Sequence, residues 1–446
     1  MLLTQDAKQT PADCRTFMAD TDHDMGSPLS APPGNDATRT GGGWPAEIGA
    51  FGCRSPAGHR SVICDMNAHT PAIPRIAAVD ILRGLTMAVM IVVNNPGTWS
   101  HMYPLLRHAP WGAFLTPADL VFPMFIFIMG VSVPLATAPR LAAGQPPRDL
   151  LRHALRRAGV LFLIGLGLNL FPDFDLPNLR IPGVLQRIAV VYLICVLAGL
   201  NGGPRLWLVS AGALLAGYTA MLYLVPVPGV GVPVITPEVS LPVWLDELVL
   251  GHHTWRGPGD PEGILSTLPA VASGLLGMVA GSRLRPGKPA ARDVGRLATA
   301  GLAVLAAGMV ASRWHPAVKE LWTLTYVLIT SGVALLALAG AWWLVDGHDG
   351  QCRRGCQFLL GPLRTLGRHA LGAFAAAHLV SDFTIRIMRL PDGDGGTMSG
   401  HHFLQHRLLA GWLPPDAASL VQSLLLLMAI VGVLVFREKR APAQVH

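Results

Sequence analysis

Apolar segments of membrane-spanning length recur along residues 75–440, separated by short polar loops. The first two, 78–97 and 118–137, are joined by a loop rich in aromatic residues, proline and histidine. About 20 apolar residues, at about 1.5 Å rise each, cross a hydrocarbon core of about 30 Å. Further segments lie at 151–171, 181–200, 206–225, 264–282, 294–311, 321–345, 366–385 and 420–436. The pattern predicts an all-α fold, a polytopic membrane bundle of about ten transmembrane helices.

Residues 1–70 do not share this pattern. They are rich in Asp, Thr, Pro and Gly and contain neither a helical period nor an apolar signal region. This composition predicts a disordered stretch. Met66 lies shortly before the first apolar segment, so a second interpretation is that translation begins there and residues 1–70 are a mis-assigned extension. Either way, residues 75–440 are predicted to form the transmembrane domain.

Two connections are long enough to fold over one end of the bundle. Residues 226–261 are too rich in Pro and Gly for a spanning helix, although 241–250 can form a short surface helix. Residues 391–415 carry several histidines among glycines. Both connections are candidates for a lid, and ordinary surface loops are the alternative.

The composition agrees with a membrane protein. The 446 residues are 51% hydrophobic and only 14% charged, with a mean hydropathy of +0.44. The formal net charge of +7 does not indicate nucleic-acid binding, because the basic residues gather in alternate short loops between apolar segments. These loops contain Arg140, Arg148, Arg152, Arg156 and Arg157, then Arg283, Arg285, Lys288, Arg292 and Arg296, then Arg353, Arg354 and Arg364, and finally Arg437, Lys439 and Arg440. The positive-inside rule then places both termini in the cytoplasm and His108 on the extracytoplasmic side.

The six cysteines do not form a recognisable framework. Cys352 and Cys356 have the spacing CxxxC in a segment that we interpret as a cytoplasmic loop, where a disulfide is not expected. A His and Cys cluster does not accompany them in the sequence, so we expect no metal.

His108 is the sharpest candidate for chemistry. It lies between two helices that carry polar residues at membrane depth, with Trp111 beside it. A neutral imidazole can act as a base or as a nucleophile. Asn94 can donate to a developing oxyanion, and Asp119 can fix the imidazole tautomer. We therefore assign His108, Asn94 and Asp119 to catalysis, the alternative being an interfacial histidine near an aromatic belt.

Other polar residues at membrane depth are candidates for binding a substrate or cofactor. Asp80 and Arg83 share a helical face and can pair, although Arg83 can also snorkel to the surface. Arg187 lies near the outer end of the fourth predicted helix, where it either snorkels or faces a polar cavity. Asp260 and Glu262 are interpreted first as caps of the sixth helix. The residues assigned to substrate or cofactor binding are Asp80, Arg83, Trp111, Arg187 and Glu262.

The common hydrolase and nucleotide-binding motifs HExxH, Walker A, GxSxG and the glycine-rich dinucleotide fingerprint do not occur in the sequence. A transporter and an intramembrane enzyme remain as the two broad classes.

Several ordered blocks resemble one family. They are VDILRGL at 79–85, VVNNPG at 92–97, HAPW at 108–111, TPADLVFPMFIFIMGVS at 116–132, RIPGVLQRIAVVYLI at 180–194, GDPEGILSTLPA at 259–270 and PLRTLGRHALGAF at 362–374. Over about residues 75–436 the chain is similar to the heparan-α-glucosaminide N-acetyltransferase family and its bacterial relatives.

The resemblance implies acetyl transfer from cytosolic acetyl-CoA, the co-substrate, to an amine across the membrane. His108 matches the catalytic histidine of the HAxW block, and Asn94 matches the asparagine of the first-helix block. In the family an asparagine commonly follows the tryptophan, whereas Gly112 follows Trp111 here. The implied partners are acetyl-CoA, a glycan or amino-sugar acceptor and the lipid bilayer, with a homodimer left open.

The chain looks bacterial, which implies an inner-membrane protein whose acceptor is an envelope or periplasmic amino sugar rather than heparan. Two alternatives stay open at this point. One is a transporter or flippase for a small anionic or glycan substrate, lined by His108, Asp119 and Arg187. The other is the second polytopic acyl-transfer family, which also uses His and Arg. The concentration of polar residues towards the outer helix ends, rather than the midplane, favours an enzyme over a transporter.

Overall fold

The computed structural model describes residues 76–255, 259–347, 351–392 and 396–440, with the backbone alone for 351–359. The predictions for residues 1–70 and for Met66 lie outside this part of the chain. The helices are α1 Ala77–Asn94, α2 Pro117–Ala142, α3 Pro147–Leu170, α4 Val184–Asn201, α5 Pro204–Leu224, α6 Leu241–Leu250, α7 Thr267–Gly281, α8 Ala291–Ala311, α9 Leu324–Ala341, α10 Gln351–Arg368, α11 Ala370–Asp382, α12 Gly400–Phe403 and α13 Pro415–Arg440. The strands β1 Arg389–Pro391 and β2 Thr397–Ser399 pair antiparallel, with Arg389 opposite Ser399.

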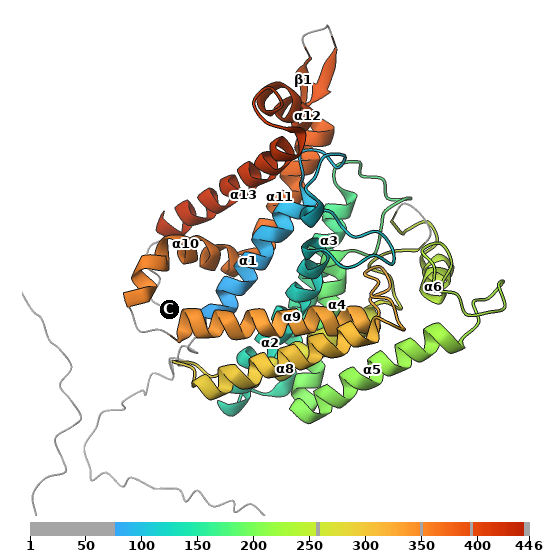
Figure 1. Ribbon diagram of the computed structural model, residues 1–446, viewed down its shortest axis with the longest axis vertical. Coiled ribbons are helices and arrows are strands. Elements are labelled where there is room, and N and C mark those ends of the chain that lie inside the picture. The colour runs from blue at the N-terminus through green and yellow to red at the C-terminus, as the bar shows by residue number, and fades with distance from the viewer. Residues whose placement is uncertain (1–75, 256–258, 348–350, 393–395, 441–446) are drawn as a thin grey trace, which may run out of the picture. The chain divides into compact units, whose positions relative to one another are not determined.

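The predicted all-α membrane fold is confirmed (Figure 1). Within the described residues, 8 helices are long and apolar enough to cross a membrane. Two of the predicted spans are helical but lie outside that set. Arginines in its first half lower the hydropathy of α3, and α7 has 15 residues, about 22 Å of helix. The chain is therefore an integral membrane protein.

The centre of the bundle is built where α2 packs along α7. The helices touch backbone to backbone at glycines. A Cβ atom on Gly130 would lie 2.1 Å from the carbonyl oxygen of Gly274. Small residues allow this close approach, which is the main source of helix association in lipid. Around this seam α4 and α9 complete a core that includes Ile126, Val191 and Tyr326.

The segment 351–368 corrects one prediction. From the sequence we predict a cytoplasmic loop with Cys352 and Cys356 here and a helix only from residue 366, whereas the whole segment forms helix α10, which packs against α1. Arginines and apolar residues alternate along it at helical spacing, as in an amphipathic helix that a search for continuous apolar runs does not find. Elsewhere in Figure 1, α8 and α9 lie side by side along much of their length.

The two long connections have secondary structure of their own. The short helix predicted at 241–250 is confirmed as α6. The second connection, for which the sequence predicts a loop over 391–415, contains β2 and α12, and β1 ends at its first residue. Their function as a lid stays a prediction.

Candidate functional site

His108 and Asp119 form a directly bonded pair at one end of the bundle. Nδ1 of His108 lies 2.8 Å from Oδ1 of Asp119. Asp119 occupies the third position of α2, and Thr116 precedes that helix in a capping box. Its second oxygen, Oδ2, accepts the backbone N–H groups of Ala109 and Thr116, each at 3.1 Å. The loop that carries the histidine is thus tied to the carboxylate that orients it.

The two members of this pair differ in exposure. The side chain of Asp119 is 1% exposed, whereas that of His108 is 37% exposed. Within the described part of the chain, Nε2 of His108 has no hydrogen-bond partner, since both polar contacts of the ring are made through Nδ1. The geometry therefore fits an imidazole whose inner nitrogen is fixed by a buried carboxylate and whose outer nitrogen is open to a reactant.

Lys319, which the sequence analysis did not single out, completes a three-residue group. Its Nζ lies 3.1 Å from Nδ1 of His108 and 3.8 Å from Oδ1 of Asp119. The lysine comes from the connection between α8 and α9, 211 residues after the histidine. It belongs to no recognisable motif, and only the fold brings it to the site.

An aromatic cluster supports the group from the start of α9. The hydroxyl of Tyr326 donates to the backbone carbonyl of Asp119 at 2.6 Å. The ring of Trp322 meets those of Tyr326 and Phe122 edge to face, at centroid distances of 5.3 and 5.2 Å. Tyr326 and Trp322 are themselves buried, with 0% and 1% of their surfaces exposed.

Arg187 lies inside the bundle and does not snorkel, with 2% of its surface exposed. Its guanidinium stands over the ring of Trp322, 5.0 Å from the centroid. One nitrogen, Nη2, donates to Gly263 O at 3.2 Å and to Ser266 Oγ at 2.5 Å. Nε and Nη1 are buried and have no partner among the described residues. An arginine of this kind can still donate to an oxygen of a bound molecule.

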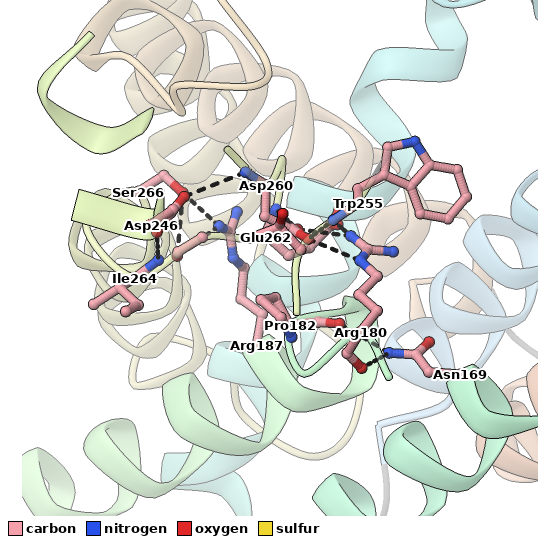
Figure 2. A network of polar contacts seen from close by, with 12 residues as sticks. Asn169, Arg180, Pro182, Arg187, Asp246, Trp255, Asp260, Glu262, Ile264 and Ser266 are labelled. Atoms are coloured by element: carbon pink, nitrogen blue, oxygen red, sulfur yellow. Dashed lines mark hydrogen bonds and ion pairs between the residues drawn. The ribbon is translucent and has the colours of Figure 1, made fainter. Parts of the chain in front are cut away.

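Arg180 joins two connections at the same end of the bundle (Figure 2). It binds both oxygens of Asp260 and also Oε2 of Glu262, the latter at 2.5 Å, and it stacks over Trp255. Burial opposes the charged form of Arg180, but the two carboxylates outweigh it and raise the pKa of the guanidinium. The capping interpretation of Asp260 and Glu262 is wrong in this respect: Ser266 is the N-cap of α7, and the two carboxylates bind Arg180 instead.

The carboxylate of Asp246, on α6, links α6 to the connection before α7. Its oxygens accept the backbone N–H groups of Ile264 at 2.8 Å and Asp260 at 3.3 Å. Only 2% of its surface is exposed. Burial, which penalises the carboxylate, raises the pKa of Asp246 to about 6.

The remaining predicted site residues are not all brought together. Asn94 is exposed at the end of α1, and no hydrogen bond within the described residues joins it to His108 or Asp119. Its neighbour Asn95 bonds Ile91 O and Ser381 Oγ instead. Trp111 is half-buried in the same connection as His108.

Asp80 and Arg83 pair as predicted, Oδ1 to Nη1 at 3.1 Å. The Nη2 group of Arg83 also donates to Ser132 Oγ at 2.6 Å. This pair lies in the first half of α1, whereas His108 follows the end of that helix. The pair therefore belongs to the other end of the bundle.

Comparison with known proteins decides the family. A family profile described as "Heparan-alpha-glucosaminide N-acetyltransferase, catalytic" matches residues 75–309. The chain belongs to this family. It is 30% identical over 333 residues to heparan-alpha-glucosaminide N-acetyltransferase of Homo sapiens. The matched region covers 61% of this chain and 49% of that protein. The protein of the same name from Mus musculus is 28% identical over the same coverage. The chain thus spans about half the length of the curated relatives it matches.

The matched region of this N-acetyltransferase family contains His108, Asp119, Arg187 and Glu262, but it ends before Lys319. Groups of three or more His, Cys, Asp or Glu side chains that could hold a metal ion do not occur among the described residues. An oriented imidazole of this kind can transfer a proton or act as a nucleophile. Two charged residues near it, Asp119 and Arg187, are buried.

Proposed function

We propose that this protein is a transmembrane N-acetyltransferase that moves an acetyl group from cytosolic acetyl-CoA to an amine on the extracytoplasmic side. The single observation that carries the proposal is the contact of 2.8 Å between His108 Nδ1 and the buried Asp119, which leaves Nε2 open, in a chain of this family. The names of the relatives favour an amino sugar as the acceptor class.

In this mechanism His108 acts in one of two ways. As a base, its Nε2 takes the proton from the acceptor nitrogen while that nitrogen attacks the thioester carbonyl. The C–S bond then breaks, and the CoA thiolate receives the proton from the ring. As a nucleophile, Nε2 attacks the carbonyl itself, the C–S bond breaks, and the CoA thiolate leaves while the ring holds the acetyl group. The amine then attacks that acetyl group, the bond from Nε2 to the acetyl carbon breaks, and the proton lost by the amine neutralises the thiolate. Asp119 holds the ring in either route.

The other assigned residues take binding roles in the proposal. Arg187 offers its two free nitrogens to an oxygen of the bound substrate, and Glu262 and Trp111 are proposed to contact the substrate from their connections. Asn94 donates to the developing oxyanion. Asp80 and Arg83 lie towards the end of the bundle at which acetyl-CoA enters.

The orientation proposed here follows from the charge of the loops. Arginine-rich connections follow α2 and α7, and the connections before α4 and α7 carry acids. By the positive-inside rule we infer that both termini are cytoplasmic, and we propose the inner membrane of a bacterium as the bilayer.

The test is turnover of acetyl-CoA by the detergent-purified protein with glucosamine as the first acceptor. His108→Ala is expected to lower turnover about a hundredfold or more while it still binds acetyl-CoA. The matched control is His101→Ala, an exposed histidine of the same connection, which should keep wild-type turnover. Exchange of labelled CoA into acetyl-CoA without an acceptor would select the covalent route. A folded wild-type protein that neither binds nor consumes acetyl-CoA would refute the proposal and favour a transporter.

A further inference from the structure

We propose that Lys319 is a positioning residue for His108 whose positive charge keeps the imidazole from retaining a second proton. The inference rests on the proposed function, because it concerns the same histidine. It goes beyond the family match, which ends at residue 309.

The polar contacts of the His108 ring converge on one nitrogen. Nδ1 of His108 lies 2.8 Å from Asp119 Oδ1 and 3.1 Å from Lys319 Nζ. One ring nitrogen either donates a proton or accepts one, so it cannot serve a carboxylate and an ammonium as hydrogen-bond partners at once. The shorter contact is the one to the carboxylate. We therefore assign the Nδ1 proton to Asp119, and Lys319 faces the ring as a charge.

His108 and Lys319 both contact the same carboxylate oxygen of Asp119, Oδ1. Oδ2 of Asp119 is already occupied by the backbone N–H groups of Ala109 and Thr116 and by the Thr116 hydroxyl. Only Oδ1 remains for His108, and Lys319 pairs with that atom at 3.8 Å. The lysine thus offsets the negative charge of a carboxylate that would otherwise stabilise a positive charge on the ring.

Lys319 is held in place by its connection. The backbone N–H of Trp322 donates to Lys319 O at 3.1 Å, and the Thr323 hydroxyl caps Val318 N at 3.0 Å and donates to Pro316 O at 2.9 Å. Trp322 is 1% exposed and has a φ of 52°. A non-glycine residue adopts this left-handed region only when its surroundings enforce it. The turn that carries the lysine is therefore held by several hydrogen bonds, as a positioning role requires.

Within the described part of the chain, two charged groups make polar contacts with the His108 ring. Asp119 approaches from α2 and Lys319 from the α8–α9 connection. Arg107, next in sequence, turns away and donates to Ser100 O and Met102 O. When the acceptor nitrogen passes its proton to Nε2, the ring becomes an imidazolium. Its Nδ1 then lies 3.1 Å from the ammonium nitrogen of Lys319. The repulsion drives that proton on to the departing CoA thiolate, so the ring ends the cycle neutral and the proton count balances.

The experiment compares kcat against pH for the wild type, Lys319→Met, Lys319→Arg and Arg313→Gln, all in the full-length protein. Arg313 is the matched control, an exposed cation in the same connection as Lys319. For Lys319→Met we expect the acid limb of the profile to move up by about one pH unit or more. Turnover should then fall about tenfold at pH 6, and it should approach the wild type near pH 8.5. Lys319→Arg should restore the limb, and Arg313→Gln should leave it unmoved.

Two results would overturn the proposal. A Lys319→Met enzyme whose rate falls equally at every pH would show a structural role only, and one with an unmoved limb and full activity would show no role. Failure of the proposed function is a separate outcome, because the wild type itself would then not consume acetyl-CoA. Elution as a monodisperse peak and an unchanged thermal midpoint verify that each variant is folded.

Discussion

Arg180 and Asp260 bind each other through two parallel hydrogen bonds, Nε to Oδ2 at 2.8 Å and Nη2 to Oδ1 at 2.7 Å, across 80 residues of chain. The Asp260 side chain is fully buried, and that of Arg180 is 18% exposed. The pair joins the connection before α4 to the connection before α7. Two helices that flank the candidate site are therefore held together at their N-terminal ends.

Removal of one partner of the Arg180 and Asp260 pair should lower the free energy of unfolding. Asp260→Asn leaves the Arg180 guanidinium without its bidentate partner in a buried place, and we expect a loss of about 3–5 kcal/mol in stability. The measurement is the thermal unfolding midpoint in detergent. The control is Asp293→Asn, which breaks the exposed pair with Arg296 and should change stability by about 0–1 kcal/mol. Equal midpoints for the two variants would contradict the structure.

Asp246 predicts a pH dependence of stability. Its pKa is raised from 3.8 to about 6 by burial, so between these values the folded protein holds a proton that the unfolded chain has lost. Its stabilising contribution is complete below about pH 3.8, is lost as the pH rises towards about 6, and is absent above that. Unfolding midpoints at pH 4.5 to 7.5 should therefore fall with pH more steeply for the wild type than for Asp246→Asn. Parallel curves would show that this carboxyl is not the titrating group.

The contact between α1 and α10 depends on Gly84. A Cβ atom there would lie 1.8 Å from the carbonyl oxygen of Leu363, an overlap that requires the helices to separate. Gly84→Ala should cost about 1–3 kcal/mol or more. Gly212→Ala is the control, because Gly212 is exposed on α5 with no atom within 4 Å of its Cβ position, and the gain in helix propensity is up to about 1 kcal/mol. Midpoints that move in opposite directions support the packing, and a neutral Gly84→Ala would count against it.

The sequence predicts features that depend on residues close together in the chain, and it does not predict contacts between distant residues. Long apolar runs predict the spanning helices, because helices in lipid carry apolar side chains. They do not predict α10, because its apolar and basic residues alternate. The pair of His108 and Asp119 was predictable because 11 residues separate them in one short connection. Lys319 and Arg180 meet their partners only through the packing of distant connections, and local pattern carries no signal for that. For the same reason Asp260 was interpreted as a helix cap, which needs only a near neighbour.

The last prediction concerns the carboxylate that orients His108. Asp119→Asn keeps the shape of the side chain and one oxygen to accept the N–H groups of Ala109 and Thr116. Its amide, however, donates to Nδ1 of His108, which moves the ring proton to Nε2 and blocks that atom as base or nucleophile. We expect kcat to fall about a hundredfold or more with little change in the thermal midpoint.

The control for this variant is Asp416→Asn, which makes the same change beside the exposed His101 at the same end of the bundle, and it should retain full turnover. A kcat for Asp119→Asn within a few-fold of the wild type would mean that the carboxylate only caps α2. The capping box alone would then explain why Thr116 and Asp119 stand three residues apart, and the His108 ring would have to be oriented by Lys319 instead. The two variants Asp119→Asn and Lys319→Met thus separate orientation of the ring from control of its charge.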